Sequence, residues 1–364
     1  MKECRVKDIC IKGSSNLKQK DVEGKKGLYP VYGASGIISS IDTYHQENEY
    51  IAIVKDGSGI GRVSFMPPKS SVIGTMQYIL PKEGYDIRYI GYCLQSLGLN
   101  KYKQGAAIPH IYFRDYGERN IVVSENINEQ RRIVSYLDSS FKLIDEIKNK
   151  ALKSLTEAKA LFQSALAEAM EPKEGTVMER IGDVFTTYAG GTPLKSQKDY
   201  YEGGEIPWLR SGEVCKKYIS ETELYITQKG MDNSSAKFYP ENTVVVAMYG
   251  ATAAQVGILK IKATSNQAVC GIIPHKDFIP EYVYYWFLFV QDDLASQAQG
   301  GAQPNISQIK IKNVLIPIIN KEEQKRIVSH LDKLSSKVRA IEEKYQKMVE
   351  ECDALKQAML RDVF

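Results

Sequence analysis

The sequence predicts an α+β protein in which two mainly β domains, related by a pseudo-twofold axis, are joined by two long antiparallel coiled-coil helices. One helix opening occurs twice, as EQRRIVSYLD from Glu129 and as EQKRIVSHLD from Glu323, 194 positions apart. Short runs rich in Val, Ile, Tyr and Thr, separated by Gly and Pro turns, precede each copy and are typical of strands. No proline interrupts the roughly 40 residues after each opening, which predicts two long helices.

Composition limits the class of protein. The 364 residues suffice for two or three domains, and a hydrophobic fraction of 43% excludes a disordered chain. A net charge of +4 permits a polyanionic partner without requiring one. Six scattered cysteines without a C-x-x-C pair predict reduced thiols rather than a zinc site. The longest apolar run, Tyr282–Val290, is too short to span a bilayer, so a cytoplasmic protein without membrane association is expected.

The duplication extends upstream of the helices and sets the predicted boundaries. EYIAIVKDGSGIGRVSF resembles NTVVVAMYGATAAQVGIL, since both have a β-rich run, a turn of small residues and a second β-rich run. A repeat period near 190 residues indicates a domain duplication rather than a solenoid. The predicted segments are a first β-rich domain (1–125), a first spacer helix (126–175), a second β-rich domain (176–319) and a second spacer helix (320–364).

Within each β-rich domain we expect one equivalent helix, in GYDIRYIGYCLQSLG and in PEYVYYWFLFVQDDLAS, whose aromatic residues belong to the core. Before each long helix stands the pattern N-x-x-E, at Asn126 and Asn320. It predicts an asparagine cap with a glutamate that reaches back to the cap.

Both long helices show a heptad-like seam that predicts pairing with each other. An antiparallel pair would place the two domains at opposite ends of helices roughly 60 Å long. The seam of the second helix holds larger residues than that of the first, so we expect large residues to pack against small ones. The predicted positions are Ile133, Leu137, Ser140, Ile144, Ile147, Ala151, Ser154, Ala158, Leu161 and Ala165, and Ile327, Leu331, Leu334, Val338, Ile341, Tyr345, Met348, Cys352, Leu355 and Met359.

Catalytic signatures are absent from the sequence. It contains no G-x-x-x-x-G-K-[ST], H-E-x-x-H, G-x-S-x-G or calcium-binding loop. The glycine-rich segment Gly57–Gly61 leads into β-type residues rather than a helix, which favours a tight turn over a nucleotide site. A chain with two similar domains and no catalytic motif suggests a protein that recognises two sites at a fixed separation. Proteins with twofold symmetry bind a DNA duplex in this way.

The segments GLYPVYGASGII and YAGGTPLKSQKDYYEGGEIPWLRSGEV, the Gly-Ala…Pro elements at Gly105–Pro109 and Gly301–Pro304, and the repeated E-Q-x-R-I-V opening together resemble the specificity subunit of type I restriction–modification systems. The resemblance covers essentially the whole chain. It implies that each β-rich domain is a target recognition domain for one half of a split double-stranded DNA sequence, and that the helices set the spacer. It further implies docking of two modification subunits, which carry the adenine methyltransferase and S-adenosylmethionine. Restriction subunits, with the motor, nuclease, ATP and Mg, complete this bacterial defence complex. The chain itself is expected to hold no cofactor or metal and to catalyse nothing.

The two domains differ in sequence, because only the second has the full GGTP…IPWLRSGE opening. We therefore expect different half-sites and an asymmetric target. Alternatives are a silent or orphan specificity cassette, a coiled-coil scaffold whose β domains bind protein, and a free-standing nuclease or methyltransferase. Base-sequence scrambling separates the scaffold from a DNA reader, and turnover or S-adenosylmethionine binding by the purified chain would indicate the enzyme.

Candidate DNA contacts follow from chemistry, because Arg, Lys, Asn and Gln read base edges while Lys, Arg, Ser, Thr and Tyr bind phosphates. Residues 1–125 carry 17 basic and 13 acidic side chains, whereas residues 176–319 carry 13 and 14, so we expect weak, salt-sensitive DNA binding by the isolated chain. The candidates are Lys55, Ser58, Arg62, Gln77, Tyr78, Lys101, Lys103, Gln104 and His110 in the first domain, and Arg210, Ser211, Tyr249, Thr252, Gln255, Asn266, Gln267, Gln303 and Asn305 in the second.

Overall fold

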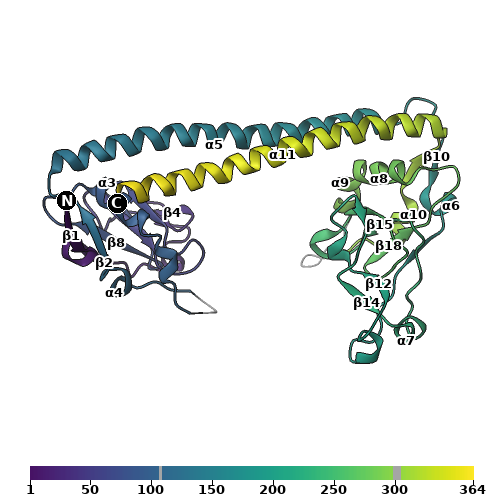
Figure 1. Ribbon diagram of the computed structural model, residues 1–364, viewed down its shortest axis with the longest axis horizontal. Coiled ribbons are helices and arrows are strands. Elements are labelled where there is room, and N and C mark those ends of the chain that lie inside the picture. Colours follow the sequence, from purple (N-terminus) through teal and green to yellow (C-terminus); the bar gives the residue numbers. More distant parts are fainter. Residues whose placement is uncertain (106–108, 298–304) are drawn as a thin grey trace. The chain divides into compact units, whose positions relative to one another are not determined.

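The computed structural model describes residues 1–105, 109–297 and 305–364, which divide into two compact units (Figure 1). The first unit contains Met1–Lys153 and Tyr345–Phe364, and the second contains Ser154–Lys344. Each unit combines one β-rich segment with part of both long helices, α5 (Ile127–Met170) and α11 (Lys321–Val363). The predicted α+β class, with two β-rich domains joined by two long helices, is confirmed.

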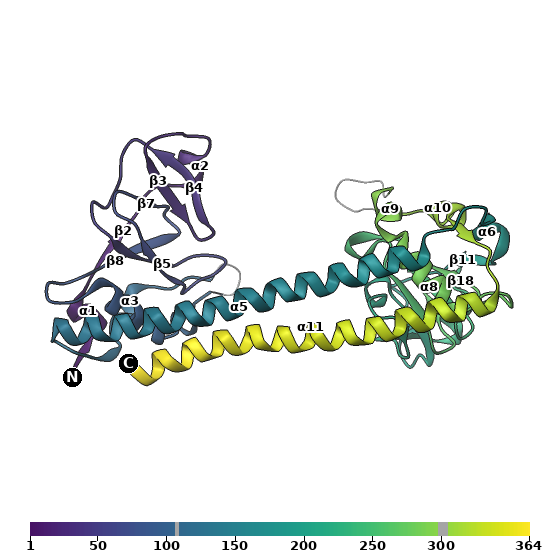
Figure 2. The ribbon, with the colours of Figure 1, turned by 90° about the horizontal axis from the view of Figure 1, so that it is seen from above.

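Two small sheets and a ribbon form the β-rich part of the first unit. A four-stranded sheet has the order β2-β8-β5-β6, and a three-stranded sheet, β4-β3-β7, stands beside it (Figure 2). β1 and β9 pair as an antiparallel ribbon, and α3 packs on β5, β6 and β8. The elements are β1 (Lys2–Arg5), α1 (Val6–Ile9), β2 (Cys10–Ser14), α2 (Gln19–Val22), β3 (Tyr29–Gly33), β4 (Gly36–Ile41), β5 (Tyr50–Val54), β6 (Val63–Met66), β7 (Ser71–Val72), β8 (Met76–Pro81), α3 (Ile87–Ser96), η1 (Leu99–Tyr102), α4 (Phe113–Tyr116) and β9 (Asn120–Val123).

The second unit repeats this plan and adds an edge strand. Its five-stranded sheet has the order β11-β18-β15-β16-β13, in which β13 pairs with β16 in parallel, and β14-β12-β17 form a three-stranded sheet. β10 and β19 form the ribbon, and α8 packs on β15 and β16. The elements are β10 (Met178–Arg180), α6 (Ile181–Val184), β11 (Thr187–Ala189), η2 (Lys198–Tyr200), β12 (Ile206–Leu209), η3 (Ser211–Glu213), β13 (Tyr218–Ile219), β14 (Leu224–Ile226), α7 (Gln228–Asp232), β15 (Val244–Ala247), η4 (Gly250–Thr252), β16 (Val256–Leu259), β17 (Thr264–Ser265), β18 (Val269–Ile272), α8 (Pro280–Phe289), α9 (Gln291–Ser296), α10 (Gln308–Asn313) and β19 (Leu315–Pro317).

The helices α3 and α8 confirm the predicted equivalent pair. Their aromatic residues lie in the core, for example Tyr89 and Tyr92 in α3 and Tyr282 and Trp286 in α8, all less than 5% exposed. Burying an aromatic side chain removes a large apolar surface from water, so these helices anchor each sheet to the long helices.

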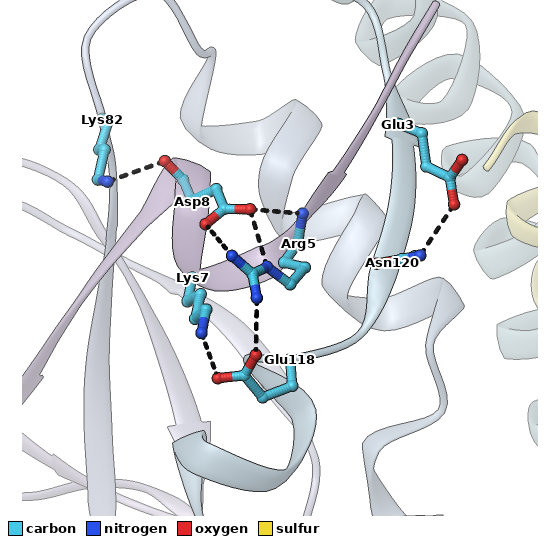
Figure 3. A network of polar contacts seen from close by, with 7 residues as sticks. All are labelled: Glu3, Arg5, Lys7, Asp8, Lys82, Glu118 and Asn120. Atoms are coloured by element: carbon cyan, nitrogen blue, oxygen red, sulfur yellow. Dashed lines mark hydrogen bonds and ion pairs between the residues drawn. The ribbon is translucent and has the colours of Figure 1, made fainter.

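Exposed charges hold the ribbon of the first unit to the short helix α1 (Figure 3). The Asp8 carboxylate accepts hydrogen bonds from the backbone and the side chain of Arg5 at 3.0 and 3.2 Å, and these contacts lower the pKa of Asp8. Glu118 accepts from Arg5 and Lys7, while Lys82 donates to the Asp8 carbonyl. These cations therefore have structural partners, and we do not count them among the candidate DNA contacts.

A fully buried glutamine anchors the start of α5 to its unit. Gln130 accepts a hydrogen bond from the amide of Asp86 at 2.7 Å through its side-chain oxygen. Its side-chain nitrogen donates to the carbonyls of Gly84 and Ser124 at 3.1 and 2.8 Å. One side chain thus satisfies three backbone groups, on the loop before α3 and at the end of β9.

Gln324 repeats this anchor at the start of α11 and is also fully buried. It accepts from the amide of Ile279 at 2.8 Å and donates to the carbonyls of Asp277 and Ile319 at 2.9 and 3.0 Å. The glutamine of the repeated E-Q-x-R-I-V opening is therefore the residue that fixes each helix to the loop preceding α3 or α8.

The asparagine caps are confirmed, whereas the reach-back of the glutamate is not seen. The side-chain oxygens of Asn126 and Asn320 accept from backbone amides of the first turn at 3.0 and 2.9 Å. Glu129 pairs with Arg132, and the amide of Asn126 already donates to the Ser124 hydroxyl. A guanidinium is a stronger partner for a carboxylate than a backbone amide, which explains the difference.

Within the first unit, α5 and α11 run antiparallel (Figures 1 and 2). Lys148 pairs with Asp353 at 2.6 Å and Asp145 pairs with Lys356 at 2.5 Å, so the numbering ascends on one helix as it descends on the other. Leu137 lies in the core of the first unit and Leu331 in that of the second.

The predicted seam is wrong at four positions. The buried stripe of α5 passes one residue later than predicted, at Phe141 rather than at Ser140. Because a straight helix has 3.6 residues per turn and faces a domain core as well as a partner helix, its buried stripe drifts from a strict 3.5 period. The exposed positions are Ile147 (49%), Leu161 (58%), Ile341 (40%) and Leu355 (51%).

Candidate nucleic-acid interface

The turn between β5 and β6 is clasped by the segment that precedes α4. We call the turn 55–62 and the segment 109–111 the first clasp. Asp56 and His110 form an antiparallel bridge, and the amide of Ile111 donates to the carbonyl of Lys55 at 2.9 Å. Gly61 has a φ of 83°, and a Cβ there would lie 2.5 Å from the backbone nitrogen of Asn100, so the turn also touches η1. Candidates from three separate segments therefore lie together.

The side chains of His110, Tyr112 and Arg114 stack one on another beside the first clasp, and we call these three side chains the stacked ladder. His110 Nδ1 lies 2.6 Å from a carboxylate oxygen of Asp56, and its ring stacks on Tyr112. Arg114 Cζ lies 4.5 Å from the centre of the Tyr112 ring. Tyr112 and Arg114 were not predicted as DNA contacts. The alternation of His110 and Tyr112 in an extended segment could have indicated Tyr112, because alternate residues of such a segment share one side, whereas Arg114 lies in the helix α4.

The rim of the first clasp is cationic. Arg62, Lys101 and Lys103 are exposed, and none of them forms an ion pair with an acidic side chain in the described ranges 1–105, 109–297 and 305–364. The half-buried Lys55 lies 3.9 Å from Asp56. Unpaired cations on an exposed edge favour contact with a polyanion.

Two further candidates share this region. Ser58 is exposed in the turn itself. Gln104 is exposed as well, and its side chain donates to Asp115 at 2.9 Å while its backbone pairs with His110.

Gln77 and Tyr78 are not surface residues, so we withdraw both as candidates. Each is 2% exposed, because β8 is a central strand and both faces of the sheet are covered there, by Tyr116 of α4 over Gln77 and by the cluster with Val72 over Tyr78. The Gln77 side chain donates to the Tyr116 hydroxyl at 2.5 Å, and the Tyr78 hydroxyl lies 2.5 Å from His45 Nδ1. The sequence pattern did not reveal that both faces of β8 are covered at these two positions.

The second unit builds an equivalent clasp from the turn 248–255 and the segment 305–306. Tyr249 and Asn305 form the antiparallel bridge, and the amide of Ile306 donates to the carbonyl of Met248 at 2.8 Å. Ala254, with a φ of 69°, stands where the first clasp has a glycine. The backbone contacts of the two clasps match.

The side chains on the second clasp are neutral. Tyr249 is 38% exposed and Asn305 is exposed, whereas Thr252 and Gln255 are half-buried. The Thr252 hydroxyl lies 3.4 Å from the carbonyl of Tyr249. The side-chain oxygen of Gln255 is buried and has no hydrogen-bond partner among the residues that the structure describes.

Four other candidates of the second unit gather at the end of β12. The amide of Asn266 donates to the carbonyl of Leu209, which brings the turn with Asn266 and Gln267 next to Arg210 and Ser211. Arg210 pairs with Glu213 and Glu223, so its charge is largely compensated. Gln267 is exposed and accepts from the Thr192 hydroxyl. Gln303 lies outside the described residues.

No group of three or more His, Cys, Asp or Glu side chains suited to a metal ion occurs in the part of the chain that the structure describes. Among the helices of that part, none has both the length and the apolar character that a bilayer span requires.

Comparison with known proteins gives a consistent family. A family model for the type I restriction modification DNA specificity domain matches residues 1–157 and 173–351. The specificity subunit of the Escherichia coli type I restriction enzyme EcoR124I/EcoR124II is 26% identical over 72% of this chain and 67% of its own length. The MjaIX specificity subunit of Methanocaldococcus jannaschii is 32% identical over 44% of this chain and 38% of its own length.

Two solved structures share the fold. A chain from a study of complex assembly and conformational transition of the type I R-M system has a TM-score of 0.76 at 17% identity, and the match covers 99% of this chain and 96% of that one. The HsdS subunit of Thermoanaerobacter tengcongensis has a TM-score of 0.53 at 18% identity, with coverage of 100% and 96%.

Proposed function

This chain belongs to the family of type I restriction–modification specificity subunits, and from that membership we propose that each of its units reads one half of a split DNA target. The relatives are specificity subunits, which implies a role in DNA recognition rather than in catalysis. In this proposal the domain boundaries are 1–125 and 176–319 for the recognition domains, and 126–175 and 320–364 for the spacer helices.

The observation that carries the proposal is a shared backbone clasp with different side chains. Arg62 and Gln255 follow Gly61 and Ala254, the last positive-φ residues of the two turns, and His110 and Asn305 occupy the clasping segments. A common scaffold with exchanged side chains is what the reading of two different base sequences requires, because phosphate contacts position a protein and side-chain contacts to base edges specify the sequence. This difference supports an asymmetric target.

The two units should bind DNA through different kinds of interaction. The cationic rim and the stacked ladder of the first clasp suit phosphates and base edges, with His110 and Arg114 as the central groups. The second clasp suits hydrogen bonding by amides and hydroxyls, with Tyr249 and Asn305 exposed. We therefore propose that the first unit supplies most of the salt-dependent affinity.

The long helices are the proposed spacer and assembly surface. α5 has 44 residues and α11 has 43, hence roughly 65 Å of helix each. Exposed apolar side chains such as Leu143 (60%) and Leu161 (58%) support docking of other subunits on the helices.

The proposed partners are two modification subunits, which hold S-adenosylmethionine and methylate adenine, and restriction subunits, which use ATP and Mg. We place the complex in the cytoplasm, where the DNA target lies.

Base-resolution mapping of adenine methylation tests the proposal. Cells that express this chain with its cognate modification subunit are compared with cells that lack this chain. A new motif of two defined blocks around a fixed unspecific gap is expected. Unchanged methylation, with both subunits present and associated, would refute the reader role. A protein-binding scaffold would leave methylation unchanged as well, but it would still bind a protein partner in the absence of DNA.

A further inference from the structure

Two pockets, one in each unit, lie at the same positions of the two long helices. In α5 the lining positions are 138, 141, 142, 145, 146 and 149, and the pocket on α11 uses the six positions that lie 194 further along. Each pocket is contained within its own unit. The duplication has therefore preserved a surface feature as well as the core.

A fixed aspartate stands at the first of these positions. In the first unit, the Asp138 oxygen Oδ1 accepts from the Tyr92 hydroxyl and, at 2.6 Å, from Arg88. In the second unit, Asp332 Oδ1 accepts from the Tyr285 hydroxyl and from Lys217. Both carboxylates are thus held by one tyrosine and one cation.

The second carboxylate oxygen, Oδ2, is the free acceptor in both pockets. Asp138 and Asp332 are 36% and 41% exposed, and neither Oδ2 has a hydrogen-bond partner among the residues that the structure describes. With Oδ1 held on two sides, Oδ2 has a defined direction. A pre-oriented acceptor loses little conformational freedom when it binds a donor.

The cations come from unrelated positions. Arg88 is on α3, 4.9 Å from the centre of the Phe65 ring, and the corresponding residue of α8 is Glu281. The second unit instead provides Lys217, which precedes β13 and is 7% exposed, with its ammonium 4.5 Å from the centre of the Tyr285 ring. The group of an aspartate, a tyrosine and a cation thus occurs in both units, although the cation comes from a different part of the chain in each. This indicates that the group is required for a function and was not simply inherited with the duplication.

We propose that Asp138 and Asp332 each accept, at Oδ2, a hydrogen bond from the same neutral N–H or O–H donor of two copies of one partner protomer. The inference rests on the proposed function and takes the modification subunit as that protomer. Two equivalent sites on one chain suit two copies of one protein. A neutral donor fits best, because Arg88 and Lys217 already balance the aspartate charge and a second cation would pay a desolvation cost without a free charge to meet.

Native mass spectrometry and titration with the modification subunit test this inference. The unaltered chain should bind two copies. Asp138→Asn and Asp332→Asn should each weaken one copy about 10-fold or more, since a donor replaces the acceptor, and the double variant should lose both. The loss should be similar at low and high salt, because the donor is neutral. Asp353→Asn, the same change outside the pockets, should leave both copies bound.

Tyr92→Phe distinguishes a structural role of Asp138 from the proposed binding role. It removes one of the two hydrogen bonds to Oδ1 but leaves Oδ2 in place. It should retain the partner better than Asp138→Asn, at a comparable change in melting temperature. Equal loss in the two variants would overturn the inference, as would two copies bound with unchanged affinity by the double variant. If the unaltered chain binds no modification subunit, the proposed function fails first, and the inference fails with it.

Discussion

Replacing Gln324 by methionine should destabilise the second unit strongly, although both side chains have similar length. The change leaves the amide of Ile279 and the carbonyls of Asp277 and Ile319 without their partner. A buried backbone group that loses its hydrogen bond costs roughly 1–3 kcal/mol. Water can reach part of the loop, and the methionine adds apolar burial, so we expect a net loss of about 2–4 kcal/mol in the free energy of unfolding.

Urea denaturation followed by tryptophan fluorescence measures this loss in the second unit. The chain has two tryptophans, Trp208 and Trp286, and both lie in that unit and are buried. With an m-value of about 2 kcal/mol/M, the midpoint should fall by about 1–2 M.

Gln228→Met is the matched control. Gln228 is exposed in the same unit as Gln324 and the two tryptophans, and its side chain donates to Asp232 at 2.7 Å. Its loss should cost less than about 0.5 kcal/mol and move the midpoint by less than about 0.25 M. Equal shifts in the two variants would refute the anchoring role of the buried glutamine.

Three further predictions follow from the clasps and the helices. Gly61→Ala should destabilise the first unit by at least about 1 kcal/mol more than Gly57→Ala in urea titrations. Both residues have a φ of 83°, but only at Gly61 would a Cβ meet the backbone of η1. Equal losses of stability in the two variants would contradict the packing of the turn against η1. Arg62→Ala should lower the magnitude of the slope of log affinity against log salt by about one in DNA-binding titrations of the methylating complex, whereas Gln255→Ala should leave the slope unchanged; a reversed pattern would move the cationic contact to the second unit. Deleting seven residues from both long helices removes about 10 Å of helix and should shorten the gap of the methylated motif by about 3 base pairs or abolish methylation, and an unchanged gap would rule out the helices as the spacer.

The sequence by itself determined the features that depend on local pattern. The repeated openings located both helix starts, and Asn126 and Asn320 cap them as predicted. The aromatic residues of α3 and α8 were assigned to the core, where they lie. Such features are readable because capping and helical periodicity involve residues a few positions apart.

Only the tertiary structure decided which side chains remain at the surface and which partners they meet. Gln77 lies within a run of β-type residues that gives no sign of its place, and its burial depends on the packing of Tyr116, 39 residues further along the chain, against its side chain. Lys217 takes the role of Arg88 from a position with no counterpart in the repeat. The match of the two clasps likewise rests on contacts between segments about 50 residues apart. Strand order and long-range pairing place these groups, and a pattern of neighbours along the chain carries no information about either.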